Sequence, residues 1–341
     1  MQQAFSSMPR LYCSLCAGLA RLGGAPPDMG GTPDRPDASR RWFSGTLLAG
    51  GLGLAVPVLA RDGGVDVGKQ SSFSKLVSAE QVEQAATQQY AQLLQEARSK
   101  NALVPAGDAQ TERLRAIAQR IIPFTADWNP RAAQWKWEVN LLANKQINAF
   151  CMPGGKIAFF TGLVQQLELT DDEVAMVMGH EVAHALREHA RERMGKSAAT
   201  GLGLELGAAL LGLGDGGRTL AGIGGQLLQL KFGRDDESEA DLVGMELAAR
   251  AGYDPRSGVS LWTKMGRATG GGGGGGGNKL AEYGSTHPQG PTRIRDIEAN
   301  LPKVMPLYER AAKPTRRWDS GLSDSGDRAR RPATPARSEA R

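Results

Sequence analysis

The chain has few cysteines, and their scarcity excludes a disulfide-stapled fold. Only three occur in 341 residues. Cys13 and Cys16 form one C-x-x-C pair, but no second pair follows, so a structural zinc module is not expected. Cys151 would be left alone in a processed protein. We therefore expect Cys151 to be a small, buried, apolar side chain and the processed protein to have no internal disulfide.

A long apolar run is also lacking at the amino terminus. Within residues 39–60, the run after Arg40 and Arg41 has roughly a dozen residues, the length of a signal-peptide core. A comfortable bilayer span needs about 20. The pattern predicts a twin-arginine-like export signal that ends at Ala60. No cysteine follows Ala60 that could carry a lipid, and periplasmic export from a bacterium is therefore expected. An uncleaved membrane anchor and a translation start at Met29 remain as alternatives.

A basic stripe is missing from the body of the chain. The net charge is +5, but residues 1–60 carry +2 (five Arg, three Asp) and residues 313–341 carry +4 (eight Lys or Arg, four Asp or Glu). Residues 61–312 therefore carry 5 − 2 − 4 = −1. Nucleic-acid binding requires a basic face on a folded domain, so no nucleic-acid partner is expected.

The remaining pattern predicts one α+β domain that is mainly helical and contains a small β-sheet. Predicted helices begin at Ser78, Asp108, Thr170 and Arg234, and the third is expected to run to about Gly195. Alternating apolar residues predict a strand over residues 135–141, and residues 153–155 predict a turn between two further strands. Another short helix is expected after Pro255.

These elements divide the chain into four segments. Residues 1–60 are the amino-terminal extension, 61–77 a flexible lead-in, 78–312 the folded domain and 313–341 a disordered tail. Inside the domain, the apolar, glycine-rich residues 198–231 predict a cover over a cleft or a hairpin that touches a membrane peripherally. Eight consecutive glycines at 270–277 predict a loop that does not bind phosphate, because no strand–glycine–helix pattern surrounds them.

The chemistry of the chain is concentrated in the motif His180-Glu181-Val182-Ala183-His184. On a helix, residues four apart share a face, so both imidazoles can reach one zinc ion. Glu181 projects beside that face, where it can act as the general base on a zinc-activated water. Two surface histidines would fit poorly with the uncharged residues around the motif. His189 falls five residues after His184, off the ligand face, and is interpreted as a surface residue.

A catalytic zinc needs a third protein ligand, and Glu237 is the candidate. It lies near the start of the next strong helix, with Asp241 one turn later. The arrangement resembles that of gluzincin peptidases, in which a glutamate from a downstream helix binds zinc and the following acid orients a ligand histidine. Glu239 competes for the role but points elsewhere on the helix.

Four ordered motifs together resemble family forty-eight of the metallopeptidases, which includes CAAX prenyl proteases, HtpX-like proteases and a soluble periplasmic branch. The resemblance covers about residues 78–301. The motifs are Asn148-Ala149-Phe150 with Pro153-Gly154-Gly155, Glu173 to Arg187, Arg234 to Asp241, and Ser285-Thr286-His287-Pro288 with Arg293. The multispanning membrane helices of the first two branches are absent, which favours the soluble periplasmic branch.

The resemblance implies a zinc metalloendopeptidase with one zinc per chain, acting in envelope protein quality control on misfolded or misassembled polypeptides. The strand after Asn148 would pair with an extended substrate, and Asn148 would hold the substrate or the oxyanion. His287 and Arg293 occupy the place of a transition-state stabiliser or of an inhibitory, zinc-capping histidine, and His287 could also be an ordinary loop residue.

Two other function classes are compatible with these motifs. A chaperone-like protein could bind polypeptides in the same cleft without cutting them, although the intact Glu181 speaks against it. A zinc hydrolase of another substrate is disfavoured by the strand predicted for peptide pairing.

Overall fold

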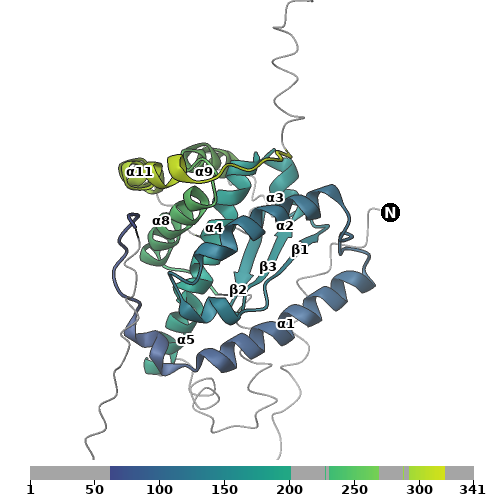
Figure 1. Ribbon diagram of the computed structural model, residues 1–341. Coiled ribbons are helices and arrows are strands. Elements are labelled where there is room, and N and C mark those ends of the chain that lie inside the picture. The colour runs from purple at the N-terminus through teal and green to yellow at the C-terminus, as the bar shows by residue number, and fades with distance from the viewer. Residues whose placement is uncertain (1–61, 201–226, 228–229, 269–286, 288–291, 319–341) are drawn as a thin grey trace, which may run out of the picture. The chain divides into compact units, whose positions relative to one another are not determined.

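The computed structural model describes residues 62–200, 227, 230–268, 287 and 292–318 (Figure 1). The predicted export signal, most of residues 198–231, the glycine run and residues 319–341 lie outside this part of the chain. The described helices are α1 (Ala79–Ser99), α2 (Ala109–Ile121), α3 (Thr161–Gln166), α4 (Asp171–Leu186), α5 (His189–Ala199), α8 (Arg234–Arg250), α9 (Ser257–Ala268) and α11 (Arg293–Arg310). The short 3₁₀ helix η2 spans Ser72–Leu76.

Three strands form one small sheet in the order β1-β3-β2 (Figure 1). They are β1 (Glu138–Leu142), β2 (Ala149–Met152) and β3 (Lys156–Phe160). β3 runs parallel to β1 and antiparallel to β2, so β2 is an edge strand of the sheet that the described residues form. The predicted turn joins β2 to β3 and uses Gly154 and Gly155, whose φ angles of 84° and 75° suit glycine. The first strand begins at residue 138, three residues later than predicted.

The central element is α4, which packs against α8 and the edge strand β2. Its start follows from the capping box predicted by the sequence: the Thr170 hydroxyl accepts from the Glu173 N–H, and the Glu173 carboxylate accepts from the Thr170 N–H. Every residue from Glu173 to Leu186 is buried. The mainly helical α+β class with an active-site helix is therefore confirmed.

Two glycines allow α4 and α8 to cross with their backbones in contact. A Cβ atom on Gly179 would lie 2.5 Å from the carbonyl oxygen of Gly244, and one on Gly244 would lie 2.5 Å from the backbone nitrogen of His180. Real Cβ atoms do not approach so closely, so neither position accepts a side chain without a shift of one helix. The crossing brings the acidic start of α8 against the histidines of α4.

Three expectations about the end of α4, the lead-in and the tail were wrong. The helix that begins at Asp171 ends at Leu186 and does not run to Gly195, because Glu188 adopts a left-handed conformation (φ 60°) and α5 then begins at His189. The lead-in is packed on the domain: the Val65 N–H donates to buried Glu246, and Val65 is itself buried. The start of the predicted tail is also attached, since the Trp318 N–H donates to Asp171.

Among the described residues, no helix combines the length and apolar character that a bilayer crossing needs.

Candidate metal centre and active site

Helix α4 presents two buried histidines to one point. The Nε2 atoms of His180 and His184 lie 3.1 Å apart, and each residue is 3% exposed. The two rings are one helical turn apart, as the spacing of the motif predicts. Two imidazoles that turn the same nitrogen toward each other in a buried site are arranged like ligands of a shared ion.

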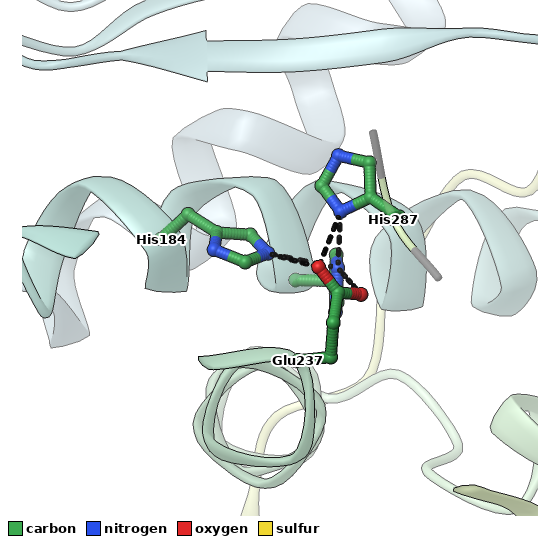
Figure 2. Close-up of side chains that lie close together, drawn as sticks. His184, Glu237 and His287 are labelled. Atoms are coloured by element: carbon green, nitrogen blue, oxygen red, sulfur yellow. Dashed lines mark hydrogen bonds and ion pairs between the residues drawn. The ribbon is translucent and has the colours of Figure 1, made fainter. Parts of the chain in front are cut away.

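Glu237 reaches the same point from α8. Its Oε2 lies 3.5 Å from Nε2 of His180, and its Oε1 lies 3.5 Å from Nε2 of His184. Figure 2 shows the carboxylate of Glu237 directed between the rings of His184 and His287. Glu239 takes no part in this cluster, because its carboxylate pairs with Arg187.

His287 supplies a fourth donor. Its Nδ1 lies 2.9 Å from Oε1 of Glu237 and 3.4 Å from Nε2 of His180, and the residue is 3% exposed. Ligand atoms of His180, His184, Glu237 and His287 all lie within 4.8 Å of one another. The structure therefore brings His287 into the same buried cluster of candidate metal donors.

The separations between these donors suit zinc. Tetrahedral zinc with bonds of about 2.0–2.1 Å to nitrogen and oxygen holds its ligand atoms about 3.3–3.4 Å apart. The pairs described above span 2.9 to 3.5 Å. Two imidazoles with one carboxylate are also a donor set of catalytic zinc sites. The donor types and these short separations therefore suit a zinc ion.

Asp241 and Arg293 contact the donor residues His180 and Glu237. Oδ1 of Asp241 lies 3.0 Å from Nδ1 of His180, an arrangement in which Nε2 of that ring faces the other donors. Arg293 donates to Asp241 through Nε at 2.6 Å and to Oε2 of Glu237 through Nη1 at 2.8 Å. Its guanidinium carbon also lies 3.5 Å from the centre of the Trp262 ring. Arg293 is therefore a positioning residue for two carboxylates.

The buried charges shift the pKa values of the donors in opposite directions. Burial alone would lower the pKa of His180, but hydrogen bonds to Asp241 and Glu237 raise it to about 9. Burial would raise the pKa of Glu237, yet His180 and His287 hold it far below its usual range. The pKa of His184 lies well below its usual value, chiefly because of burial. Metal binding at neutral pH must therefore displace a proton from His180.

Glu181 lies beside the cluster without belonging to it. The residue is 2% exposed, and its Oε1 is 3.8 Å from Nε2 of His287. This is the place expected of a general base that does not bind the metal. Asn148 lies directly before β2, and its carbonyl accepts a hydrogen bond from the Phe160 N–H at 3.0 Å. The proposed contact of Asn148 with substrate stays a prediction.

His189 was predicted to be a surface residue, and this was wrong. It is 1% exposed, and its Nδ1 lies 2.9 Å from Nδ1 of His184. The break between α4 and α5 turns the ring inward. Burial, with Arg187 nearby, lowers the pKa of His189 to about 3, so that the ring is neutral at pH 7.

Comparison with known families agrees with this geometry. The model of peptidase family M48 matches residues 108–301, which are more than half of the chain. The chain belongs to this family. As a member of M48 it is a zinc metalloendopeptidase, and the metal is the one that the four-donor cluster fits.

The most similar relatives include several with mitochondrial names. The chain is 30% identical to the mitochondrial metalloendopeptidase OMA1 of Schizosaccharomyces pombe over 273 residues, which are 80% of this chain and 75% of that protein. It is 38% identical to the OMA1 of Arabidopsis thaliana over 48% of this chain and 32% of that protein. The β-barrel assembly-enhancing protease of Escherichia coli is 25% identical over 51% of this chain and 36% of its own length.

These relatives correct the prediction of a periplasmic location. The Schizosaccharomyces pombe relative, which matches 80% of this chain, is a mitochondrial protein of a eukaryote, and further relatives carry the same description. An amino-terminal arginine pair before a short apolar run is a weak pattern, so the assignment of a bacterial export signal did not have the specificity to decide the compartment. The chain spans only about a third of the Arabidopsis and Escherichia relatives.

Proposed function

We propose that the enzyme cleaves internal peptide bonds of misfolded or misassembled polypeptides, with His180, His184 and Glu237 as zinc ligands and Glu181 as the general base. The observation that carries this proposal is the buried group of four metal donors with Glu181 beside it. Zinc, when bound, polarises the scissile carbonyl and lowers the pKa of water. Glu181 accepts the proton from the attacking water and delivers it to the leaving amine.

The quality-control role is supported by the relatives. One of them is named as a protease that enhances β-barrel assembly, which ties this kind of domain to the handling of incompletely assembled proteins. Such substrates expose extended backbone that a folded protein would keep paired. An open strand edge beside the active-site helix suits them, because it recognises backbone in preference to one particular sequence.

The edge strand β2 offers the backbone groups that an extended substrate needs. The bond from Phe160 N–H to the Asn148 carbonyl fixes these two residues as a hydrogen-bonded pair, and residue 150 then pairs with β3 in the same way. Ala149 and Cys151 lie between such pairs, so their N–H and C=O groups point away from β3. Both residues also belong to the core that contains α4, which places this edge next to the active-site helix.

A scan of N-methylated peptides tests this pairing. In an antiparallel or parallel pair, only alternate residues of the substrate direct their N–H toward β2. Methylation of those nitrogens is expected to raise KM about 10-fold each, the equivalent of about 1.4 kcal/mol for a lost hydrogen bond. The intervening nitrogens should tolerate methylation. Steady-state kinetics on a fluorogenic peptide would measure both sets, and a profile without a period of two would contradict strand pairing at β2.

His287 has a consequence for the resting enzyme. With four protein donors around the metal, the site has the closed ligand set of a structural centre, whereas a catalytic zinc needs an open position. We infer that His287 occupies that position until substrate displaces it. The short distances from Nδ1 of His287 to Glu237 and His180 support this assignment over a role as a transition-state stabiliser.

The function is tested by casein cleavage with the full-length protein, together with the zinc content of the same sample. Cleavage that a chelator abolishes and added zinc restores, with about one zinc per chain, is the expected result. Bound zinc with weak cleavage that His287→Ala increases at least several-fold would show that His287 closes the site. A protein that binds no zinc, or cleaves equally well after complete metal removal, would contradict the proposed function.

A further inference from the structure

The two zinc-ligating histidines of α4 are supported in different ways. His180 meets a carboxylate, because its Nδ1 lies 3.0 Å from Asp241. His184 meets another imidazole, because its Nδ1 lies 2.9 Å from Nδ1 of His189. Nothing in the proposed chemistry so far uses His189. A fully buried histidine in contact with a metal ligand therefore requires an explanation of its own.

The local backbone is shaped to make this contact. In a continuous helix, residue 189 would lie about 140° around the axis from residue 184, and its side chain would point off the ligand face. The left-handed conformation of Glu188 ends that helix and starts α5 at His189. A residue other than glycine rarely adopts this conformation. Its cost is met by packing, since the ring of His189 is buried against His184 and Phe232.

The contact between the two rings determines which nitrogen of each ring carries the proton. For Nε2 of His184 to face the metal as a ligand, its Nδ1 must carry the proton. That proton can only be donated to an unprotonated Nδ1 of His189, which places the proton of His189 on its own Nε2. This nitrogen is buried and has no hydrogen-bond acceptor at normal distance among the described residues. Oε2 of Glu239 lies 3.6 Å away from it.

Glu239 is itself fixed. Its Oε1 accepts a hydrogen bond from Nε of Arg187, and Nη2 of Arg187 donates to the carbonyl of Gly68 at 3.1 Å. The negative charge of Glu239 thus lies on the side of His189 where the Nε2 proton must be. A carboxylate at 3.6 Å favours that tautomer through its charge, and a small side-chain shift would complete a direct hydrogen bond.

We propose that His189 is a positioning residue that fixes the tautomer and ring orientation of the zinc ligand His184, and that Glu239 orients His189 in turn. The order of contacts is Glu239, His189, His184, metal. This inference rests on the proposed zinc site. Groups that orient a ligand histidine in this manner typically contribute 10- to 100-fold to metal affinity.

The test is the zinc affinity of the full-length protein, measured by competition with a chromophoric chelator. His189→Phe keeps an aromatic ring but removes the acceptor, and we expect it to weaken zinc binding about 10- to 100-fold. His189→Asn keeps an oxygen acceptor near the position of Nδ1 and is expected to recover most of the loss. The thermal midpoints of the metal-free proteins provide the readout of folding. Equal affinity of His189→Phe and the parent, or an equal loss in both variants, would overturn the proposal.

A second pair of variants tests the outer contact. Glu239→Gln removes the charge beside Nε2 of His189, and a several-fold loss of zinc affinity is expected. Glu192→Gln is the matched control, because Glu192 is also a partly buried helical carboxylate with a basic partner, Lys196. It should leave zinc affinity unchanged. If Glu239→Gln behaves like the control, Glu239 has no part in orienting His189. If the parent protein itself binds no zinc, the proposed function fails together with this inference.

Discussion

Replacement of Glu181 by glutamine is expected to remove nearly all peptide hydrolysis while zinc stays bound. Glutamine keeps the size of the side chain but cannot accept the proton of the attacking water, and a lost general base typically lowers kcat by about 10² to 10⁴. Zinc affinity should change little, because Glu181 is not among the four clustered donors. The measurement is kcat on a fluorogenic peptide, with the zinc content determined on the same preparation.

Glu246→Gln is the matched control for this variant. Glu246 is also a fully buried glutamate, but it pairs with Arg250 and the backbone of Val65, away from the metal donors. Its replacement should affect stability and leave the turnover of the folded fraction near that of the parent. Turnover close to normal in Glu181→Gln would refute the assignment of the general base. Loss of zinc from that variant would indicate that Glu181 is a ligand.

Replacement of Arg293 by methionine is expected to lower the free energy of unfolding of the metal-free protein by about 3–5 kcal/mol. Methionine keeps much of the length and volume, but it leaves two buried carboxylates, on Glu237 and Asp241, without the cation that donates to both. Removing one member of a buried charged network has this effect because the remaining charges stay desolvated. Urea unfolding of the chelator-treated proteins would measure the difference.

Urea unfolding of the zinc-bound proteins separates the stabilisation that Arg293 provides from the stabilisation that zinc provides. Zinc gives Glu237 a new cation, so the destabilisation by Arg293→Met should be smaller in the loaded protein. Arg256→Met serves as the control, because the Arg256 side chain is 63% exposed and its pair with Asp254 should contribute less than about 1 kcal/mol. An effect of Arg293→Met no larger than that of the control would show that Arg293 does not stabilise the buried carboxylates.

The sequence predicts the metal centre well because most of its geometry is local. The four-residue spacing of His180 and His184 and the capping box at Thr170 each act within one or two helical turns. Glu237 and Asp241 share a helix in the same way. Their position against the histidines could be inferred only by resemblance, since the approach of α4 to α8 depends on contact between glycines 65 positions apart.

The misassigned residues depend on contacts that no local pattern contains. The end of α4 is stabilised by Gln70 and Asn129, whose side-chain amides donate to the Leu186 carbonyl at 2.9 and 3.0 Å. Both partners come from distant parts of the chain. Without them, the charged residues after Leu186 resemble a continuing exposed helix, and His189 is placed on its outer face. The packed lead-in was missed for the same reason.

Zinc joins parts of the chain that are far apart in sequence, and it therefore acts as a cross-link as well as a cofactor. With His184, Glu237 and His287 as ligands, the pairs 184–237 and 237–287 would close loops of 53 and 50 residues. The entropic cost of closing a loop rises only with the logarithm of its length, so the eight glycines at 270–277 add about 0.2 kcal/mol to the second closure. Chain length between the ligands can thus change widely while the metal keeps the same three segments together.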